Sequence, residues 1–295
     1  MRSGETTERV WSRTVEAWLH GEPAERRSWP VPKLNALAGG LKAGQVVVLG
    51  GPAGAGKATL LIQAAVAWLN EGLRVAWVDP DARMATVLPR WLALAAHVSR
   101  ADAARFPAWW SRMQQVEHWP QERALPEHLR LWRDLPMARC AMAYKAMRDW
   151  PLTWVDAPEP WPVLAHQLES LDPPPQVVVI REWSLLPWGR IPPSERGPAI
   201  ARGTKALARR LGMPMVLTVS QDFCVQPELE TACASADLAG AADQVWWLDR
   251  DGEGPVPGSG WTPVRLRLLK HRLGPRGTWR GLRFMANGSF VDRSA

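Results

Sequence analysis

The sequence has little cysteine and no long hydrophobic run, and each of these absences excludes a class of protein. Its three cysteines, Cys140, Cys224 and Cys233, have no CxxC or metal-ligand spacing, and they are too few for a disulfide framework. No apolar run approaches the ~18 residues of a membrane helix. The opening residues MRSGETTERVW contain no hydrophobic signal core. We therefore expect a cytoplasmic protein with no membrane among its partners.

Lysine, tyrosine and phenylalanine are also scarce, and this scarcity affects how the charge is interpreted. Arginine outnumbers lysine 30 to 6, whereas tyrosine occurs once, phenylalanine four times and tryptophan 19 times. Such a bias is typical of a G+C-rich genome. The net charge of +7 therefore leaves two interpretations open, namely nucleic-acid binding through phosphate contacts and genome composition alone. Packing accounts for most of the tryptophans, and base stacking stays open for a minority.

Residues 1–30 are expected to form an amphipathic helix and a linker. The segment 5–20 places its apolar side chains near helical spacing. The next stretch, GEPAERRSWPVP, contains one glycine and three prolines, which is typical of a linker. The helix would fold back on its own domain, dock on a neighbouring subunit or stay a loosely attached tail, and its composition leaves all three open.

From residue 44 the pattern predicts strands that alternate with helices. Expected strands are 44–51, 73–81, 151–158, 176–181, 213–221 and 242–251, and expected helices are 57–72, 162–171 and 199–212, with further helical stretches over 84–148 broken by Pro107, Pro120, Pro126 and Pro136. The segment 264–285 predicts a hairpin that turns at Gly274–Gly277. This alternation indicates an α/β fold whose sheet is mostly parallel and covered on both faces.

A glycine-rich loop at 51–59, GPAGAGKAT, lies between the first expected strand and the first expected helix of this region. It matches the phosphate-loop pattern G-x-x-x-x-G-K, in which glycines let backbone N–H groups surround phosphate oxygens. The Ser or Thr that follows the lysine in this pattern is replaced by Ala58, and a threonine comes one position later. The expected nucleotide-binding residues are Gly51, Pro52, Ala53, Gly54, Ala55, Gly56, Lys57, Ala58 and Thr59.

Residues 31–295 resemble the C-terminal RecA-like ATPase domain of replicative DnaB-type hexameric helicases. The resemblance rests on an ordered series of segments: KLNALAGGLKAGQVVVLGGPAGAGKATL, VAWVDPDARMATVLPRWLA, PLTWVDAP, VVVIREWSLL, RGTKALARRLGMPMVLTVSQ, ADQVWWLDRD and KHRLGPRGTWRGLRF. RadA-like and KaiC-like ATPases fit less well, because they share less of K-x-R-x-G-P-x-G-T. Because residues 31–295 resemble the C-terminal domain, we expect the family's separate N-terminal domain to be missing from this sequence.

The resemblance implies a RecA-like P-loop NTPase with a parallel-dominated sheet, flanking helices and a C-terminal β-hairpin. It also implies ATP as the ligand, a homo-oligomeric ring, single-stranded DNA, and replication or repair proteins as partners. Lys57 matches the phosphate-loop lysine, Gln221 matches the sensor glutamine, and Asp81 aligns with the catalytic glutamate. Lys270 and Arg272 match the pair that reaches the neighbouring subunit's nucleotide.

Two departures from the family affect the metal site. Ala58 removes the hydroxyl that binds Mg²⁺, and Arg181 stands where the family has its Walker B aspartate. One hypothesis is that Arg181 contacts phosphate directly, so that nucleotide binds with little need for Mg²⁺ and is hydrolysed slowly. The other is that Arg181 pairs with Asp79, Asp81 or Glu182 and the pocket is empty. Glu182 is expected to point to the opposite face of its strand.

The DNA contacts are expected on loops at 187–199 and 222–236. The first loop contains Arg190 and Arg196, whereas the second contains glutamates and no basic residue, which makes it a poor phosphate-binding loop. Arg202 is a third candidate, and the composition favours the alternative that all three belong to an arginine-rich surface. Two functions stay open: a nucleotide-responsive protein of replication or repair with little catalysis, and an active DNA helicase or translocase.

Overall fold

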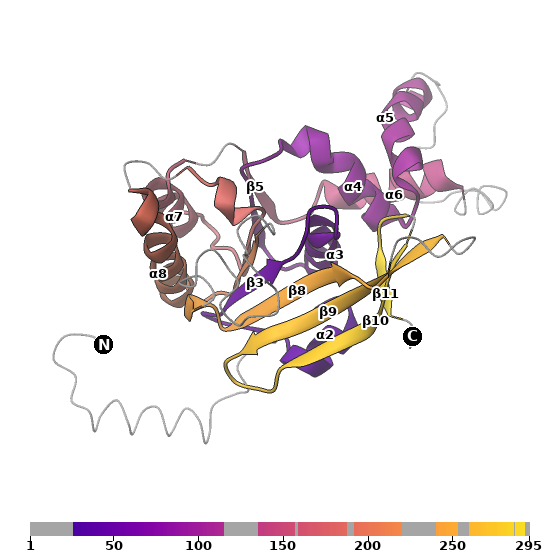
Figure 1. Ribbon diagram of the computed structural model, residues 1–295. Helices are drawn as coiled ribbons and strands as arrows, with labels where there is room; N and C mark the ends of the chain where they lie inside the picture. Colours follow the sequence, from indigo (N-terminus) through magenta and orange to yellow (C-terminus); the bar gives the residue numbers. More distant parts are fainter. Residues whose placement is uncertain are drawn as a thin grey trace, which may run out of the picture.

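The computed structural model of the chain describes residues 26–114, 135–156, 159–187, 192–219, 240–252, 260–285 and 287–292. The expected N-terminal helix, Gln221, Arg190, the second expected DNA loop and the helix breaks at Pro120 and Pro126 lie outside these residues. Within the described residues, the strands and helices follow the predicted order. Most of the strands form one large sheet, and helices lie against it (Figure 1).

The sheet has nine strands in the order β11-β10-β9-β8-β3-β7-β6-β4-β5. Its strands are β3 (Val46–Gly50), β4 (Val75–Asp79), β5 (Leu152–Asp156), β6 (Val177–Ile180), β7 (Met215–Thr218), β8 (Gln244–Arg250), β9 (Trp261–His271), β10 (Gly277–Met285) and β11 (Phe290–Asp292). The strands β5, β4, β6, β7, β3 and β8 run parallel, whereas β9, β10 and β11 add antiparallel pairs. The predicted parallel-dominated sheet with a C-terminal hairpin is confirmed.

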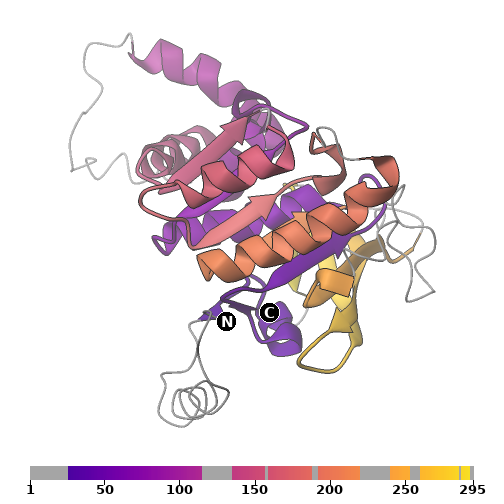
Figure 2. The same ribbon diagram turned by 90° about the vertical axis from the view of Figure 1, so that its left-hand side faces the viewer.

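Helices cover both faces of the sheet, as expected for buried parallel strands. They are α2 (Pro32–Ala38), α3 (Lys57–Asn70), α4 (Met84–Ala96), α5 (Arg100–Gln114), α6 (Pro136–Met147), α7 (Trp161–Glu169) and α8 (Pro193–Leu211). Apolar side chains of α2, α3 and α4 share one core with alternate strand residues, and those of α7 and α8 share a second core with the others. Figure 2 shows α8 running across its face of the sheet.

Two expected helix boundaries are wrong. Pro107 was expected to end a helix, but it lies inside α5, because Phe106 and Trp110 of the same helix pack on Tyr144 of α6 and hold the chain helical across the proline. The helix expected from residue 199 begins at Pro193, in a position where proline is well tolerated since its missing N–H needs no partner. Residues 193–199 of the first expected DNA loop are therefore helical.

The C-terminal end of the expected linker packs on the domain. The strand β1 (Arg26–Arg27) pairs with β2 (Leu41–Lys42) in a small antiparallel sheet. Trp29 is buried, and its ring centroid lies 5.7 Å from that of Trp68 on α3. The indole N–H of Trp68 donates to the carbonyl of Ser28 at 2.6 Å. Residues 26–31 are thereby attached to the side of the sheet covered by α3.

Several of the described tryptophans are core residues, as the packing interpretation predicted. Trp68, Trp77 and Trp91 are fully buried. The rings of Trp77 and Trp91 meet edge to face at 4.9 Å, and Trp154 stacks on Trp77 at 6.1 Å. These rings fill the space between β4, β5 and α4.

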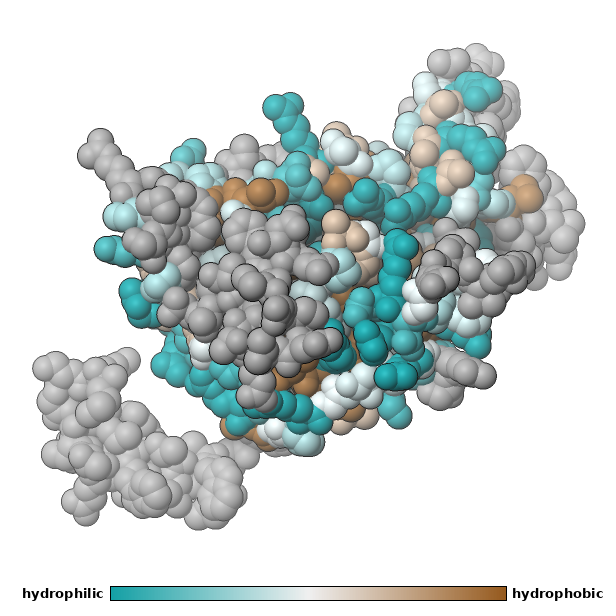
Figure 3. Space-filling view, viewed as in Figure 1, coloured by the Kyte–Doolittle hydropathy of each residue, from teal (hydrophilic) through white to brown (hydrophobic). Residues whose placement is uncertain are grey.

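The surface of the described residues is consistent with the absence of a hydrophobic run in the sequence. None of the helices that the structure describes is long and apolar enough to cross a membrane. On the face shown in Figure 3, hydrophilic side chains predominate among the described residues.

Candidate nucleotide-binding site

The phosphate loop connects β3 to α3 and takes a backbone conformation that requires its glycines. Gly51 has φ of 149°, and a Cβ there would lie 2.2 Å from the carbonyl oxygen of Leu248. Gly56 has φ of 98°, and its Cβ would lie 2.7 Å from the ring of Phe290. Side chains would therefore clash at both positions, and only glycine fits.

Lys57 is the first residue of α3 and is buried within the loop. Its ammonium donates to the carbonyl oxygens of Gly51 at 2.7 Å and Pro52 at 3.1 Å. The positive end of the α3 dipole lies at the same place. Glycine conformations, a helix N-terminus and a buried ammonium together fit a phosphate group.

The hydroxyl that comes one residue late does not take the place of the missing one. Thr59 is buried, and its Oγ1 accepts a hydrogen bond from Arg100 Nη2 at 3.1 Å. Each step along an α-helix turns the side chain by about 100°, so Ala58 and Thr59 face different directions. Arg100 is the first residue of α5. Burial, and secondarily the charge of Arg90, lower the pKa of Arg100 from its usual value.

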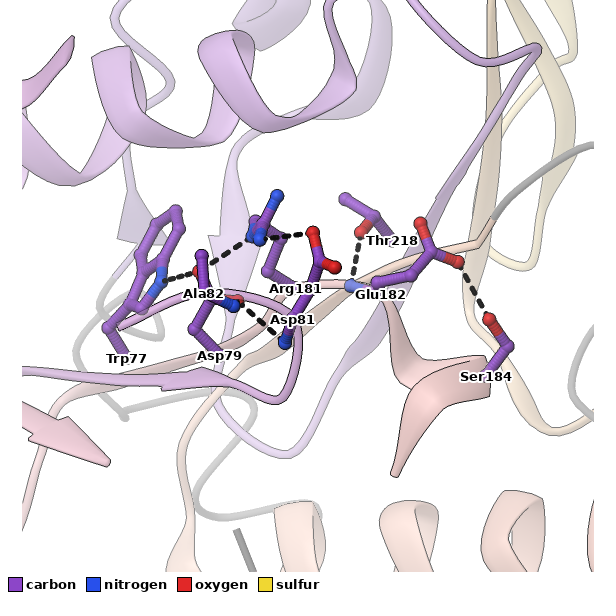
Figure 4. Close-up of polar contacts among 8 residues, drawn as sticks. All are labelled: Trp77, Asp79, Asp81, Ala82, Arg181, Glu182, Ser184 and Thr218. Atoms are coloured by element: carbon purple, nitrogen blue, oxygen red, sulfur yellow. Dashed lines mark hydrogen bonds and ion pairs between the residues drawn. The ribbon is translucent and has the colours of Figure 1, made fainter. Parts of the chain in front are cut away.

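Arg181 follows β6 and bridges two carboxylates at the end of β4 (Figure 4). Its Nε donates to Asp79 Oδ2 at 2.6 Å, and its Nη2 donates to Asp81 Oδ2 at 2.7 Å. Burial lowers the pKa of Arg181, but the hydrogen bond and charge of Asp79, followed by the charge and hydrogen bond of Asp81, raise the pKa above its usual value. The structure thus contains the ion pairs of the second hypothesis for Arg181.

Asp79 holds this arrangement in place. Its Oδ1 accepts the backbone N–H groups of Asp81 and Ala82 at 3.1 and 3.0 Å, and its Oδ2 accepts the indole N–H of Trp77 at 3.4 Å. The turn after β4 is therefore built around one buried carboxylate. Asp81, aligned with the family's catalytic glutamate, projects from this turn and is half-exposed.

Glu182 lies just beyond the end of β6, which ends at Ile180. It was expected to point to the opposite face from Arg181, and Figure 4 shows the two side chains extending in different directions, Arg181 towards Asp79 and Asp81 and Glu182 towards Ser184. Glu182 has a left-handed φ of 53°, so its direction is set by the turn after the strand. The backbone N–H of Glu182 donates to Thr218 Oγ1 at 2.7 Å, and its carboxylate accepts the hydroxyl of Ser184 at 2.7 Å.

These groups surround a cavity of about 370 Å³, within the size range of small-molecule sites. Its lining is Ala53, Gly54, Gly56, Lys57, Ala58, Thr59, Arg90, Arg100, Arg181, Glu182, Thr218 and Phe284. The sequence motifs identified the loop and Arg181 but missed Arg90, Arg100, Thr218 and Phe284. Single arginines in helices and an aromatic residue in a hairpin carry no local signal for this role.

The residues present do not fit the magnesium site that the fold family implies. The side chain of Ala58 offers no oxygen, and the residue expected at the Walker B position from the sequence resemblance is Arg181, a guanidinium paired with Asp79. Among the described residues, no cluster of three or more His, Cys, Asp or Glu side chains could hold a metal ion. The lysine and arginines that line the cavity fit an anion instead.

Lys270 and Arg272 lie at the end of the central strands that is opposite to the phosphate loop. The strand β9 is antiparallel to β8, and His271 pairs with Gln244, which in turn pairs with Val47 at the start of β3. The phosphate loop follows the far end of β3, at Gly50. The length of β3, roughly 13 Å at ~3.3 Å per residue, therefore separates this pair from the loop of the same chain.

Neighbouring residues at this end of the strands hold both side chains in place. Lys270 Nζ donates to the carbonyl oxygen of Gly240 at 2.8 Å, and Arg272 Nε lies 3.3 Å from Asp243 Oδ1. Asp243 also pairs with Lys205. Burial, then the charge of Arg272, lower the pKa of Lys270, against the opposing charge of Asp243.

The candidate DNA-binding arginines are only partly described. Arg202 is exposed on α8. Arg196 belongs to the first turns of that helix, and its side chain, like all of Arg190, lies outside the described residues. Their roles stay predictions.

The sheet order, the strand-loop-helix junction and the anion-binding loop define a P-loop NTPase of RecA-like fold. A family model described as Novel STAND NTPase 5 matches residues 33–101. No curated protein sequence is significantly similar to the chain.

Solved structures give the fold more specifically. The ATPase domain of G40P matches with a TM-score of 0.73 and 18% identity over 98% of this chain and 99% of that one. A structure titled for a DnaB-like replicative helicase and its interactions with primase matches with a TM-score of 0.71 and 17% identity, over 98% of this chain and 67% of that one. The RadB recombinase matches with a TM-score of 0.55 and 16% identity, over 90% of this chain and 99% of that one. The chain thus has the fold of a DnaB-like helicase ATPase domain, as the sequence resemblance predicted.

Proposed function

We propose that this chain is a DnaB-helicase-like ATP-binding protein that acts on DNA in replication or repair and hydrolyses ATP slowly. The observation that carries the proposal is the double ion pair of Arg181 with Asp79 and Asp81 beside an intact phosphate loop. The loop supports binding, because its glycines and Lys57 keep the geometry that phosphate needs. The ion pair is the reason to expect that the bound nucleotide is hydrolysed slowly.

Slow hydrolysis is expected from the electrostatics of this pair. Arg181 bonds one carboxylate oxygen of Asp81, the group expected to orient the attacking water. A guanidinium also opposes a divalent cation, since two unit charges 4 Å apart interact by ~4 kcal/mol at an effective dielectric near 20. With Ala58 removing a hydroxyl ligand as well, we infer that ATP binds with little need for Mg²⁺.

The ring is supported by the position of Lys270 and Arg272. They lie near the start of β3, and the phosphate loop of their own chain follows its other end, so we infer that they serve the nucleotide of another copy. A site completed by a neighbour requires a head-to-tail assembly, which closes into a ring when the rotation permits. We propose single-stranded DNA as its ligand, with Arg190, Arg196 and Arg202 as candidate contacts.

The second candidate is an active DNA helicase or translocase, or a RadA-like or KaiC-like ATPase. The fold shared with the ATPase domain of G40P favours it, although a fold does not determine an activity. One assay separates the two functions: steady-state ATP hydrolysis by the purified chain with Mg²⁺, with and without single-stranded DNA. We expect ATP binding with turnover far below ~1 s⁻¹. Turnover of ordinary rate that Lys57→Ala abolishes would reject slow hydrolysis and favour the second candidate instead.

A further inference from the structure

Arg100 lies on the wall of the cavity although no sequence motif marks it. Its guanidinium is held over the first turn of α3 by the hydrogen bond to Thr59 at 3.1 Å. Ala58 and Arg100 both line this cavity, so α5 brings a cation to the cavity where the loop lacks the metal-binding hydroxyl.

The turn between β10 and β11 fixes Arg100 from the other side. Gly288 has φ of 87°, and a Cβ there would lie 3.0 Å from Arg100 Nε and 3.2 Å from its Nη2. The backbone of the turn therefore packs directly on the guanidinium. A side chain held between Thr59 and Gly288 loses little further freedom when it binds a ligand, which favours affinity.

The charges of Arg181 and Arg100 are compensated differently. Arg181 bonds two carboxylates. In the part of the chain that the structure describes, no carboxylate lies within ion-pair distance of Arg100. The charged group that acts on it is Arg90, which lines the same cavity. Two arginines of like charge facing one cavity favour an anionic ligand.

We propose that Arg100 binds a phosphate group in this cavity and, with Lys57, supplies the positive charge that lets the loop hold a nucleoside triphosphate without a divalent cation. The inference rests on the proposed function, because it names the group that makes metal-free binding possible. It assigns the phosphate contact to Arg100, whereas Arg181 stays with Asp79 and Asp81.

The test measures the affinity of the full chain for ATP and for inorganic triphosphate in EDTA, and again for ATP with Mg²⁺. The variants are Arg100→Gln, Arg100→Lys and the matched control Arg105→Gln. Arg105 lies on the same helix, is 73% exposed and pairs with Asp102. Thermal unfolding of each variant checks that it is folded.

We expect the wild-type chain to bind both ligands in EDTA. Arg100→Gln should weaken both by about 10- to 100-fold, the effect of losing a charge-assisted hydrogen bond. Arg100→Lys should retain part of the affinity, because the charge remains, and Arg105→Gln should bind as the wild type does. Loss of affinity by Arg100→Gln with retention by Arg100→Lys identifies a charge contact rather than a folding defect.

Three results would overturn the inference. Unchanged affinity of Arg100→Gln removes Arg100 from the site. Weakened ATP binding with unchanged triphosphate binding assigns Arg100 to the nucleoside instead. Wild-type binding that requires Mg²⁺ rejects metal-free binding while leaving ATP as the ligand. A wild-type chain that binds ATP under neither condition would contradict the proposed function itself.

Discussion

The guanidinium of Arg181 lies 2.7 Å from a carboxylate oxygen of Asp81 and 2.6 Å from one of Asp79. Two neighbouring strands, β6 and β4, end side by side, so the residues after them meet at the edge of the sheet where the phosphate loop begins. The residue expected at the Walker B position is thereby joined to Asp81, the residue expected at the position of the catalytic glutamate.

Breaking this pair should destabilise the fold. Arg181→Met leaves Asp79, whose side chain is 0% exposed, without its cation. Removing one partner of a buried pair costs about 3 kcal/mol or more, which urea unfolding would measure. The control Arg210→Met breaks an exposed pair with Glu169 and should cost less than ~1 kcal/mol. Equal losses in the two variants would show that the Asp79 pair is not structural.

The phosphate loop should not tolerate a side chain at Gly56. Gly56→Ala places a methyl group 2.7 Å from Phe290, so we expect loss of ATP binding together with reduced stability. Gly72→Ala is the matched control, because φ is 79° there but no atom lies within 4 Å. It should cost about 1 kcal/mol and leave ATP affinity unchanged. Normal ATP binding by the Gly56→Ala chain would show that the loop does not need a glycine at this position.

Arg272 should affect ATP hydrolysis at the site of a neighbouring subunit without affecting the affinity of its own chain for ATP. Arg272→Ala is expected to keep ATP affinity within about twofold and to lower any residual turnover at least about tenfold, as for a group that acts on the transition state of a neighbour. Mixing Arg272→Ala with Lys57→Ala chains should restore turnover above either alone, since some shared sites regain both groups. The exposed Arg280→Ala serves as the control. A mixture no better than its components would argue against a shared site.

Cys140 should be unreactive in the folded chain. Burial, and secondarily the charge of Asp102, raise the pKa of Cys140 to about 11 from an ordinary 9.0. At pH 8 the thiolate fraction is then about 100-fold lower than for an ordinary thiol. We expect iodoacetamide to label Cys140 at least about 100-fold more slowly in the native than in the urea-unfolded chain, as mapped by mass spectrometry. The thiol's contribution to stability is present below about pH 9 and is lost as pH rises towards 11. Similar labelling rates would contradict the burial.

The order of strands and helices could be predicted because it depends on local periodicity. The run Val46–Leu49 is apolar at successive positions, as a strand buried on both faces requires, and the loop after it is marked by its glycines. Pro107 misled the prediction because the aromatic contact between α5 and α6 is not local. The start of α8 was missed for a related reason, since proline at a first helical position resembles proline in a loop.

The sequence by itself determined that the chain contains a phosphate-loop motif and that Ala58 stands where this motif has a hydroxyl residue, because both depend on residue identity within a short motif. That Arg181 stands at the Walker B position is an expectation from the resemblance. Only the tertiary structure decided that Arg181 joins Asp79 and Asp81, residues about 100 positions away, and that Arg100 faces the same cavity. Strand register and the packing of α5 against the β10–β11 turn set those contacts, and both arise from interactions between distant segments that no local pattern records.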